Sequence, residues 1–466
     1  MVFSSAVFLF IFLPVVILLH TVIQNIKVRN GLLIVASLVF YAFGEPVYVL
    51  MLIGSVAVNY IFGTLLARNK NKAVLAVAVV VNLALLVVFK YTGFLVTSIN
   101  QIFSSNIPVP DIVMPIGISF YTFQAISYII DTYRSEDSGK QSFFDVLLYI
   151  SLFPQLIAGP IVKYNSIKDE IKTRMVTTDG LLHGIRLFVI GLAKKVLIAN
   201  TVGYAADTVF SMNTSLIDMP LAWFGAICYT LQIYFDFSGY SDMALGIGRM
   251  MGFTFPKNFD HPYVASGIRV FWRKWHMSLT AWFREYLYIP LGGNRKGLAR
   301  QILNSMIVFT CTGIWHGANV TFIVWGVMHG ILISVETLIF KKKEQDRFNV
   351  LKWIYTMIFV VVGFAIFRAD DIAYAMSYVG KMFSFNSFAA ARAVGLSFLT
   401  PYFITILVLA AIACTPVCRY IADKTKNHKI YNVINYGSYV VVAVLLLLCI
   451  MNLASTSYNP FIYFRF

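Results

Sequence analysis

The chain has 466 residues, of which 59% are hydrophobic and only 12% are charged, and its mean hydropathy is +0.75. Charged residues make up roughly a quarter of a soluble domain, so this composition excludes a soluble globular protein. The 37 basic and 21 acidic residues give a net charge of +16, but no soluble basic face is present to bind nucleic acid. We therefore expect a lipid bilayer around the chain and no nucleic-acid partner.

Continuous apolar stretches, rather than short alternating ones, predict an all-α polytopic membrane protein. At about 20 residues per span, we expect roughly 11–13 membrane helices, re-entrant segments included. The segments lie near 2–24, 31–43, 47–67, 72–93, 113–133, 143–161, 179–201, 219–240, 300–317, 320–340, 350–368, 399–420 and 432–455. The short 31–43 segment and the proline-containing 143–161 segment are expected to be bent or re-entrant.

Basic residues cluster in some loops and avoid others, which indicates the orientation of the chain. The basic clusters lie at 27–29, 68–72, 163–174, 341–343 and 419–429. By the positive-inside rule these loops are cytoplasmic. Residues 43–46, 97–112, 212–218 and 370–398 would then lie outside, together with both termini.

The stretch 241–300 departs from this pattern, because from Gly252 to Arg300 it is too polar to cross a bilayer. On a helical wheel the apolar residues of 268–286 share one side; they are Ile268, Phe271, Trp272, Trp275, Leu279, Trp282 and Tyr286. This pattern predicts one amphipathic helix at the cytoplasmic interface. His276 lies at the border of its two faces, from where it can turn towards the interior. Simple anchoring explains most of the other residues.

Trp315, His316 and Gly317 interrupt a run of apolar residues, 302–312 before them and 320–327 after. An imidazole at membrane depth costs free energy unless it is used, which makes His316 the first candidate for chemistry. A buried histidine satisfied by one backbone carbonyl is the alternative. His329, thirteen residues further on, is interpreted as a packing histidine.

The remaining polar groups allow more than one interpretation. Asp236 and Asp242 lie at the end of an apolar span. Their carboxylates would cap the next helix, pair with a nearby arginine or line a reaction chamber. Arg273, Lys274, Arg295 and Lys296 belong to a basic cytosolic face that suits either a phosphate-bearing ligand or anionic lipid headgroups. The five cysteines lack metal-ligand spacing, and neither a P-loop nor a dinucleotide fingerprint occurs. We expect no bound metal or redox cofactor.

Several long strings carry a resemblance to a known family. They are FWRKWHMSLTAWFREYLYIPLGGNR at 271–295, QIYFDFSGYSD at 232–242, GIWHGAN at 313–319, FPQLIAGP at 153–160 and NPFIYF at 459–464. With these strings the chain resembles the membrane-bound O-acyltransferase family, and within it the branch that acetylates alginate and other cell-surface polysaccharides. The 291–296 stretch favours this branch over the D-alanyl transferases of teichoic acids.

The resemblance implies one membrane domain over 1–466, with 241–300 as a cytoplasmic segment inside it and helices around a buried chamber. It implies acyl transfer from a thioester to a hydroxyl, with His316 matching the family's essential histidine, which suits a general base. His276 matches the second polar position, where it would orient His316 or polarise the thioester carbonyl. Asn319 would stabilise an oxyanion or cap a helix, and Trp315 would line the chamber.

The expected donor substrate is cytosolic acetyl-CoA, whose phosphates would meet Arg273, Lys274, Arg295 and Lys296. The resemblance also implies a bacterial cytoplasmic membrane, a polysaccharide acceptor and an extracytoplasmic acetyltransferase partner protein. The outward connection 370–398 is too short for a domain of its own, and its phenylalanines suit packing on a membrane or a partner. Another acyl group or acceptor, such as a teichoic acid, lipid or protein, is the alternative within enzymes. A glycan or lipid transporter is the alternative outside them, although no internal repeat supports it.

Overall fold

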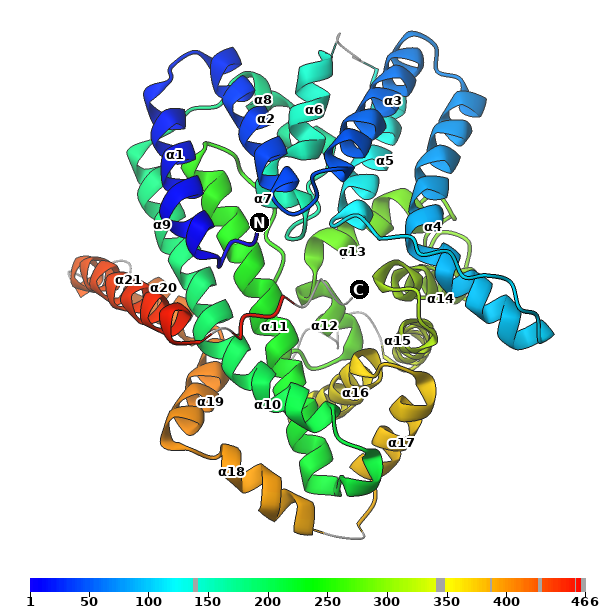
Figure 1. Ribbon diagram of the computed structural model, residues 1–466, viewed down its shortest axis with the longest axis vertical. Coiled ribbons are helices and arrows are strands. Elements are labelled where there is room, and N and C mark those ends of the chain that lie inside the picture. The colour runs from blue at the N-terminus through cyan, green and yellow to red at the C-terminus, as the bar shows by residue number, and fades with distance from the viewer. Residues whose placement is uncertain (137–140, 341–347, 386–387, 426–429, 457, 462–466) are drawn as a thin grey trace. The chain divides into compact units, whose positions relative to one another are not determined.

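The computed structural model (Figure 1) describes residues 1–136, 141–340, 348–385, 388–425, 430–456 and 458–461. Within these ranges every regular element is a helix, which confirms the all-α prediction. The basic residues 341–343, Lys426 and Lys429 and positions 462–464 of the C-terminal string lie outside the described residues. The topology predicted from the basic loops stays a prediction along the whole chain.

The chain divides into two compact units. The first comprises Met1–Phe188 and Ser241–Lys257, and the second comprises Val189–Tyr240 and Asn258–Phe466. Two helices, α9 (Thr178–Ala193) and α11 (Met219–Met250), contribute residues to both. Because α11 continues to Met250, the segment predicted over 241–300 begins inside this helix, and its cytoplasmic location stays a prediction. That the units act as one domain stays a prediction.

The first unit consists of helices packed around aromatic side chains. Its elements are η1 (Phe8–Phe12), α1 (Leu13–Val22), α2 (Ile26–Ala42), α3 (Tyr48–Arg68), α4 (Lys72–Phe103), α5 (Ile118–Arg134), α6 (Phe143–Ser151), α7 (Phe153–Leu156) and α8 (Tyr164–Lys172). The chain leaves the helical conformation at Leu152, between α6 and α7, as the two prolines of this segment led us to expect. Buried Asn59 and Asn82 exchange side-chain hydrogen bonds between α3 and α4 at 3.0 and 2.8 Å. This pairing satisfies two amides that would be costly to leave alone among apolar helices.

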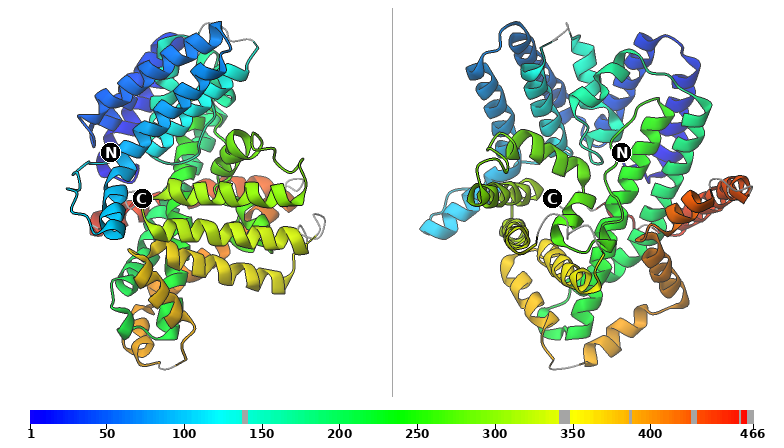
Figure 2. Two further views of the ribbon diagram at one scale, coloured as in Figure 1. Left: turned by 90° about the vertical axis from the view of Figure 1, so that its right-hand side faces the viewer. Right: turned by 180° about the vertical axis from the view of Figure 1, so that it is seen from behind.

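The second unit holds the remaining elements. They are η2 (Lys194–Ala199), α10 (Asn200–Phe210), η3 (Thr214–Leu216), η4 (Pro262–Val264), α12 (Ile268–Lys274), α13 (Met277–Phe283), η5 (Arg284–Tyr288), α14 (Leu298–His316), α15 (Val320–Ile339), α16 (Val350–Arg368), α17 (Ile372–Met382), η7 (Ala391–Gly395), α18 (Leu396–Phe398), α19 (Pro401–Ala413), α20 (Val417–Thr425) and α21 (Ile430–Ser455). The left view of Figure 2 shows α14, α15 and α16 side by side as neighbouring helices. The described part of the connection expected over 370–398 contains α17, η7 and α18, and Ala375, Tyr378 and Met382 of α17 are buried.

Five of the described helices are long and apolar enough to cross a membrane, or six if one bent pair forms a single span. They are α3, α4, α15, α16 and Asn432–Ser455 of α21, and the bent pair joins Ala391–Phe398 to Pro401–Ala413 at 77°. This number is below the 11–13 expected from the sequence. Most other expected spans are also helical, but they are shorter, broken or interrupted by polar residues, so that length and apolarity alone do not select them.

Glycines bring α14 and α15 into close contact and thereby place His316. A Cβ atom on Gly313 would collide with the carbonyl oxygen of Phe322, and one on Gly326 would collide with that of Phe309. Only glycine permits this approach of two helix backbones. His316 is the last residue of α14, so the crossing fixes its distance from the side chains of α15.

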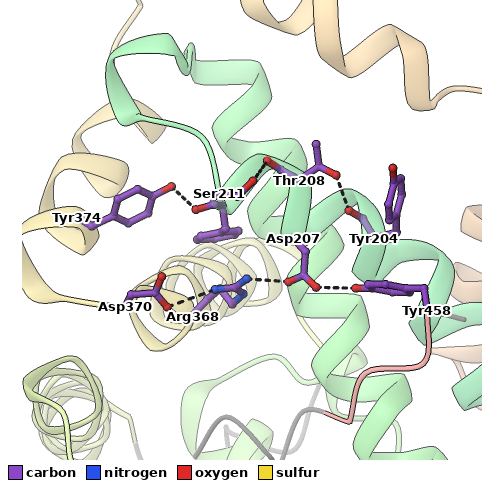
Figure 3. A network of polar contacts seen from close by, with 9 residues as sticks. Tyr204, Asp207, Thr208, Ser211, Arg368, Asp370, Tyr374 and Tyr458 are labelled. Carbon is purple, nitrogen blue, oxygen red and sulfur yellow. Dashed lines mark hydrogen bonds and ion pairs between the residues drawn. The ribbon is translucent and has the colours of Figure 1, made fainter.

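A polar network ties the C-terminal segment to α10 and α16 (Figure 3). Arg368 donates to Asp207 at 2.7 Å, and Tyr458 donates to the other oxygen of the same carboxylate at 2.6 Å. Further along the segment, the buried Lys195 donates to the Pro460 carbonyl and forms an ion pair with Asp236 at 2.9 Å. Among its three expected alternatives, Asp236 therefore forms an ion pair, but its partner is a lysine rather than the expected arginine.

Candidate active site

The expected amphipathic helix is broken at the histidine that it carries. Helix α12 ends at Lys274, and α13 begins after His276, whose φ of +43° and ψ of +54° are left-handed. The prediction of one continuous helix is therefore wrong, and its apolar side is buried within the protein itself rather than left exposed to anchor the segment in a membrane. Periodicity could not reveal the break, because the residues before and after it keep one face. A left-handed non-glycine residue costs about 1–2 kcal/mol, so other contacts have to hold His276 in place.

The N-terminus of α12 is capped by side chains of two neighbouring helices. Glu336 of α15, which is only 2% exposed, accepts from the backbone N–H groups of Ile268 at 2.6 Å and Arg269 at 2.9 Å. The hydroxyl of Thr356 in α16 accepts from the N–H of Gly267 at 2.8 Å. These bonds satisfy donors that an isolated helix start leaves unpaired. They fix the position of the short helix that leads to His276.

The C-terminal side of the break is held by Asn258. Its backbone carbonyl accepts from Met277 N–H at 2.8 Å. Its side-chain oxygen accepts from the Ser278 N–H at 3.3 Å and from the Ser278 hydroxyl at 2.9 Å, and it lies 3.0 Å from Nδ1 of His276. Asn258 thus caps α13 from a distance of 18 residues in sequence. Nothing in the sequence had singled it out.

His276 is 2% exposed, and its Nε2 atom has no hydrogen-bond partner among the described residues. Its ring packs edge-on against Phe237, with centroids 4.6 Å apart. Burial lowers the pKa of His276 well below its usual value, and the neighbouring His316 lowers it further. The imidazole is therefore neutral at physiological pH and keeps a lone pair.

His316 lies at the end of α14 in an aromatic environment. Its ring centroid is 5.3 Å from that of Trp325 and 5.2 Å from that of Phe367, both nearly perpendicular to it. Trp315 lies beside both histidines, with ring centroids 5.0 Å from His316 and 6.2 Å from His276. The two histidines, 40 positions apart in sequence, thus belong to one cluster of rings.

His276 and His316 line the same cavity, which has a volume of about 300 Å³. We call it the histidine cavity. Its other lining residues are Arg269, Trp272, Arg273, Trp275, Leu279, Thr280, Phe283, Arg284, Tyr288, Ser305, Val308, Phe309, Thr312 and Ile333. The lining contains three arginines and, among the described residues, no carboxylate. It therefore suits a ligand with an apolar body and anionic groups.

Of the residues predicted for this site, His276, His316 and Arg273 line the histidine cavity. The lining formed by described residues does not include Lys274, Arg295, Lys296, Trp315, Asp236 or Asn319. Asp242 belongs to the first unit. Asn319 accepts from Thr321 N–H at 3.1 Å and donates to the Asp370 carbonyl at 2.7 Å, which is the expected helix-capping alternative. Its roles and those of the other predicted residues in the reaction stay predictions.

The sequence analysis did not identify Asn258, Glu336 and Thr356, whose hydrogen bonds hold the segment that carries His276. Glu336 could have been identified from the sequence, because it is a carboxylate inside an apolar span, where such a group needs a polar partner. His329 behaves as expected for a packing histidine, because its Nδ1 accepts from the indole N–H of Trp272 at 3.3 Å.

Comparisons with known proteins identify a family and several relatives of this chain. The model of the membrane-bound O-acyltransferase family matches residues 82–380. A probable alginate O-acetylase of Pseudomonas putida is 40% identical over 490 aligned positions, which cover 100% of both chains. A peptidoglycan O-acetyltransferase of Helicobacter pylori is 36% identical over 83% of this chain and 80% of its own. A teichoic acid D-alanyltransferase of Bacillus subtilis is 28% identical over 60% of this chain and 78% of its own.

The chain belongs to the membrane-bound O-acyltransferase family. It is a multi-pass membrane protein and an acyltransferase, which sets aside the alternative of a glycan or lipid transporter.

Proposed function

We propose that the protein moves an acetyl group from cytosolic acetyl-CoA across the membrane, by transfer to a hydroxyl group, towards the hydroxyl groups of an extracytoplasmic polysaccharide. The observation that carries the proposal is that His276 and His316, two histidines far apart in sequence, line one cavity together with three arginines. Relatives named as acetylases of alginate and peptidoglycan support acetyl as the acyl group and a polysaccharide as the acceptor.

His316 is the general base of the proposed reaction. As the acceptor oxygen attacks the thioester carbon, its proton passes to the His316 ring, and the carbon–sulfur bond breaks. The imidazolium then returns the proton to the departing thiolate of CoA, so that the histidine is neutral again. General-base assistance of this kind contributes about 10²–10⁴-fold to a rate.

The arginines of the histidine cavity bind the donor. CoA carries phosphates at one end and the thioester at the other, joined by a flexible arm. Arg269, Arg273 and Arg284 would hold the phosphates, while the aromatic lining accommodates the arm. No metal or redox cofactor takes part in this proposal. The positive-inside pattern supports a cytoplasmic entrance for the donor, in the cytoplasmic membrane of a bacterium.

Replacement of His316 by alanine tests the proposed function. Transfer of radiolabelled acetyl from acetyl-CoA should fall by roughly 10²–10⁴-fold, while the variant still purifies as a folded, monodisperse protein. His329→Ala is the matched control, because this histidine packs against Trp272 and does not line the cavity. Near-parent transfer by a folded His316→Ala protein would refute the mechanism.

The proposal includes an extracytoplasmic partner protein that delivers the acetyl group to the polymer. Proteoliposomes with acetyl-CoA on the cytoplasmic side and polysaccharide outside should release CoA slowly, and polymer acetylation should require the added partner. Full-rate acetylation of the polymer by this chain alone would contradict the requirement for a partner. Acceptor recognition would then reside in the chain itself.

A further inference from the structure

The hydrogen bonds of Asn258 determine which nitrogen of His276 carries the proton. A backbone N–H can only donate, and the N–H of Ser278 points at the Asn258 side-chain atom at 3.3 Å. That atom is therefore the amide oxygen, which can only accept. Because the same oxygen lies 3.0 Å from Nδ1 of His276, Nδ1 has to be the donor of this bond.

The tautomer of His276 follows directly. A neutral imidazole has one N–H, so a proton on Nδ1 leaves Nε2 with a lone pair. Nε2 is buried and has no hydrogen-bond partner among the described residues. Leaving a buried polar atom such as Nε2 without a hydrogen-bond partner costs free energy. The His276 ring lines the histidine cavity and Asn258 does not, so a ligand in the cavity is the partner that Nε2 would accept from.

We propose that Asn258 is a positioning residue for the transfer reaction, which holds His276 as a hydrogen-bond and proton acceptor towards the histidine cavity. The inference rests on the proposed function and deepens it. In this tautomer the neutral ring has no N–H at Nε2 to offer to a thioester carbonyl. The resemblance implied two roles for His276, to orient His316 or to polarise the thioester carbonyl. The second is therefore disfavoured in the resting state, whereas the first is compatible with a ring that accepts a hydrogen bond.

Asn258 also maintains the backbone geometry on which this role depends. Its main-chain oxygen binds Met277 and its side-chain oxygen binds Ser278, the first two residues of α13. A substitution at 258 therefore disturbs both the tautomer and the helix start. A useful test has to separate these two effects.

The first experiment measures the tautomer without any reaction. Magic-angle-spinning NMR of protein labelled with 15N only in its histidine rings distinguishes protonated from unprotonated nitrogens, and the His276 signals are assigned by their loss in His276→Ala. We expect Nδ1 protonated and Nε2 unprotonated at neutral pH, and a mixture of tautomers in Asn258→Leu. A proton on Nε2 in the parent protein would overturn the proposal, whatever the activity of His316→Ala.

The second experiment uses kinetics with a matched pair of variants. Asn258→Leu should lower kcat by at least about 10-fold with little change in the KM for acetyl-CoA. Ser278→Ala removes one bond to the same oxygen but keeps the His276 contact, so it should retain most of the activity. Equal losses in the two folded variants would show that Asn258 acts only as a helix cap and would overturn the proposal.

Asn258→Asp provides a test that does not depend on loss of folding. It keeps an acceptor for Nδ1 and adds a negative charge, which favours the imidazolium and raises the pKa of His276. His316 and the three cavity arginines face the same space and are unchanged in this variant. The pH titration of the His276 ring, followed by its 15N signals, should move up by about one pH unit or more. Because an acceptor has to be unprotonated, kcat at low pH should fall relative to the parent protein. A titration that stays in place, or activity that rises at low pH, would refute the acceptor role. Failure of the proposed function would instead appear as an active His316→Ala protein.

Discussion

Replacing Glu336 by alanine should loosen the segment that carries His276. The carboxylate of Glu336 accepts from two N–H groups at the start of α12, at 2.6 and 2.9 Å, and it is almost completely buried. Alanine removes the acceptor of both donors, in a hydrogen bond that is buried at Ile268 and partly buried at Arg269. Glutamine keeps one acceptor oxygen, so it should satisfy only one of the two donors.

The expected cost follows from the number of unpaired donors. Each buried N–H without an acceptor costs about 1–3 kcal/mol, so Glu336→Ala should destabilise the fold by about 2–6 kcal/mol and Glu336→Gln by about half as much. An unfolding entropy of about 2.1 cal/mol/K per residue gives a chain of 466 residues about 1 kcal/mol/K. The Tm of the alanine variant should therefore fall by about 2–6 °C.

Thermal unfolding in detergent, followed by intrinsic tryptophan fluorescence, measures this difference at a fixed scan rate. Ser334→Ala is the matched control, since its hydroxyl lies on the same helix, is buried and donates only to the Gly330 carbonyl of that helix. The control should change Tm by less than the glutamine variant. If Glu336→Ala unfolds at the parent temperature and transfers acetyl at the parent rate, then the two bonds do not hold α12.

Three further predictions concern packing, donor binding and topology. Gly313→Ala should reduce both Tm and transfer, by about 1–3 kcal/mol in stability, and an unchanged protein would show that the helix approach tolerates a methyl group. Arg273→Gln should raise the KM for acetyl-CoA about 2- to 5-fold with kcat nearly constant. Lys274→Gln is the control, because Lys274 does not line the cavity, and it should leave the KM unchanged. Equal effects of the two substitutions would contradict a specific donor site. In a background without exposed cysteines, Phe385→Cys should react with an impermeant thiol reagent in intact cells, and Lys296→Cys should not. Labelling of Lys296→Cys but not of Phe385→Cys would place the basic face that contains Lys296 outside the cell.

The general nature of the protein was determined by composition and local pattern. Apolar stretches of this length form helices in a membrane, since only a helix satisfies its backbone within one continuous segment. His316 was identified for the same reason, because an imidazole among apolar residues is conspicuous whatever surrounds it. The long strings around His276 and His316 indicated the family, and the comparisons confirmed it.

The site was decided by the tertiary structure. An uninterrupted apolar face predicted one helix through His276, and only contacts from distant segments make a left-handed break there possible. Those contacts come from Asn258, 18 residues before the histidine, and from Glu336, which binds the start of α12 from another helix. Sequence periodicity reports which face of a helix is buried, but not what it is buried against. The tautomer of His276 depends on the direction of a single hydrogen bond across the fold, so it became readable only once the chain was folded.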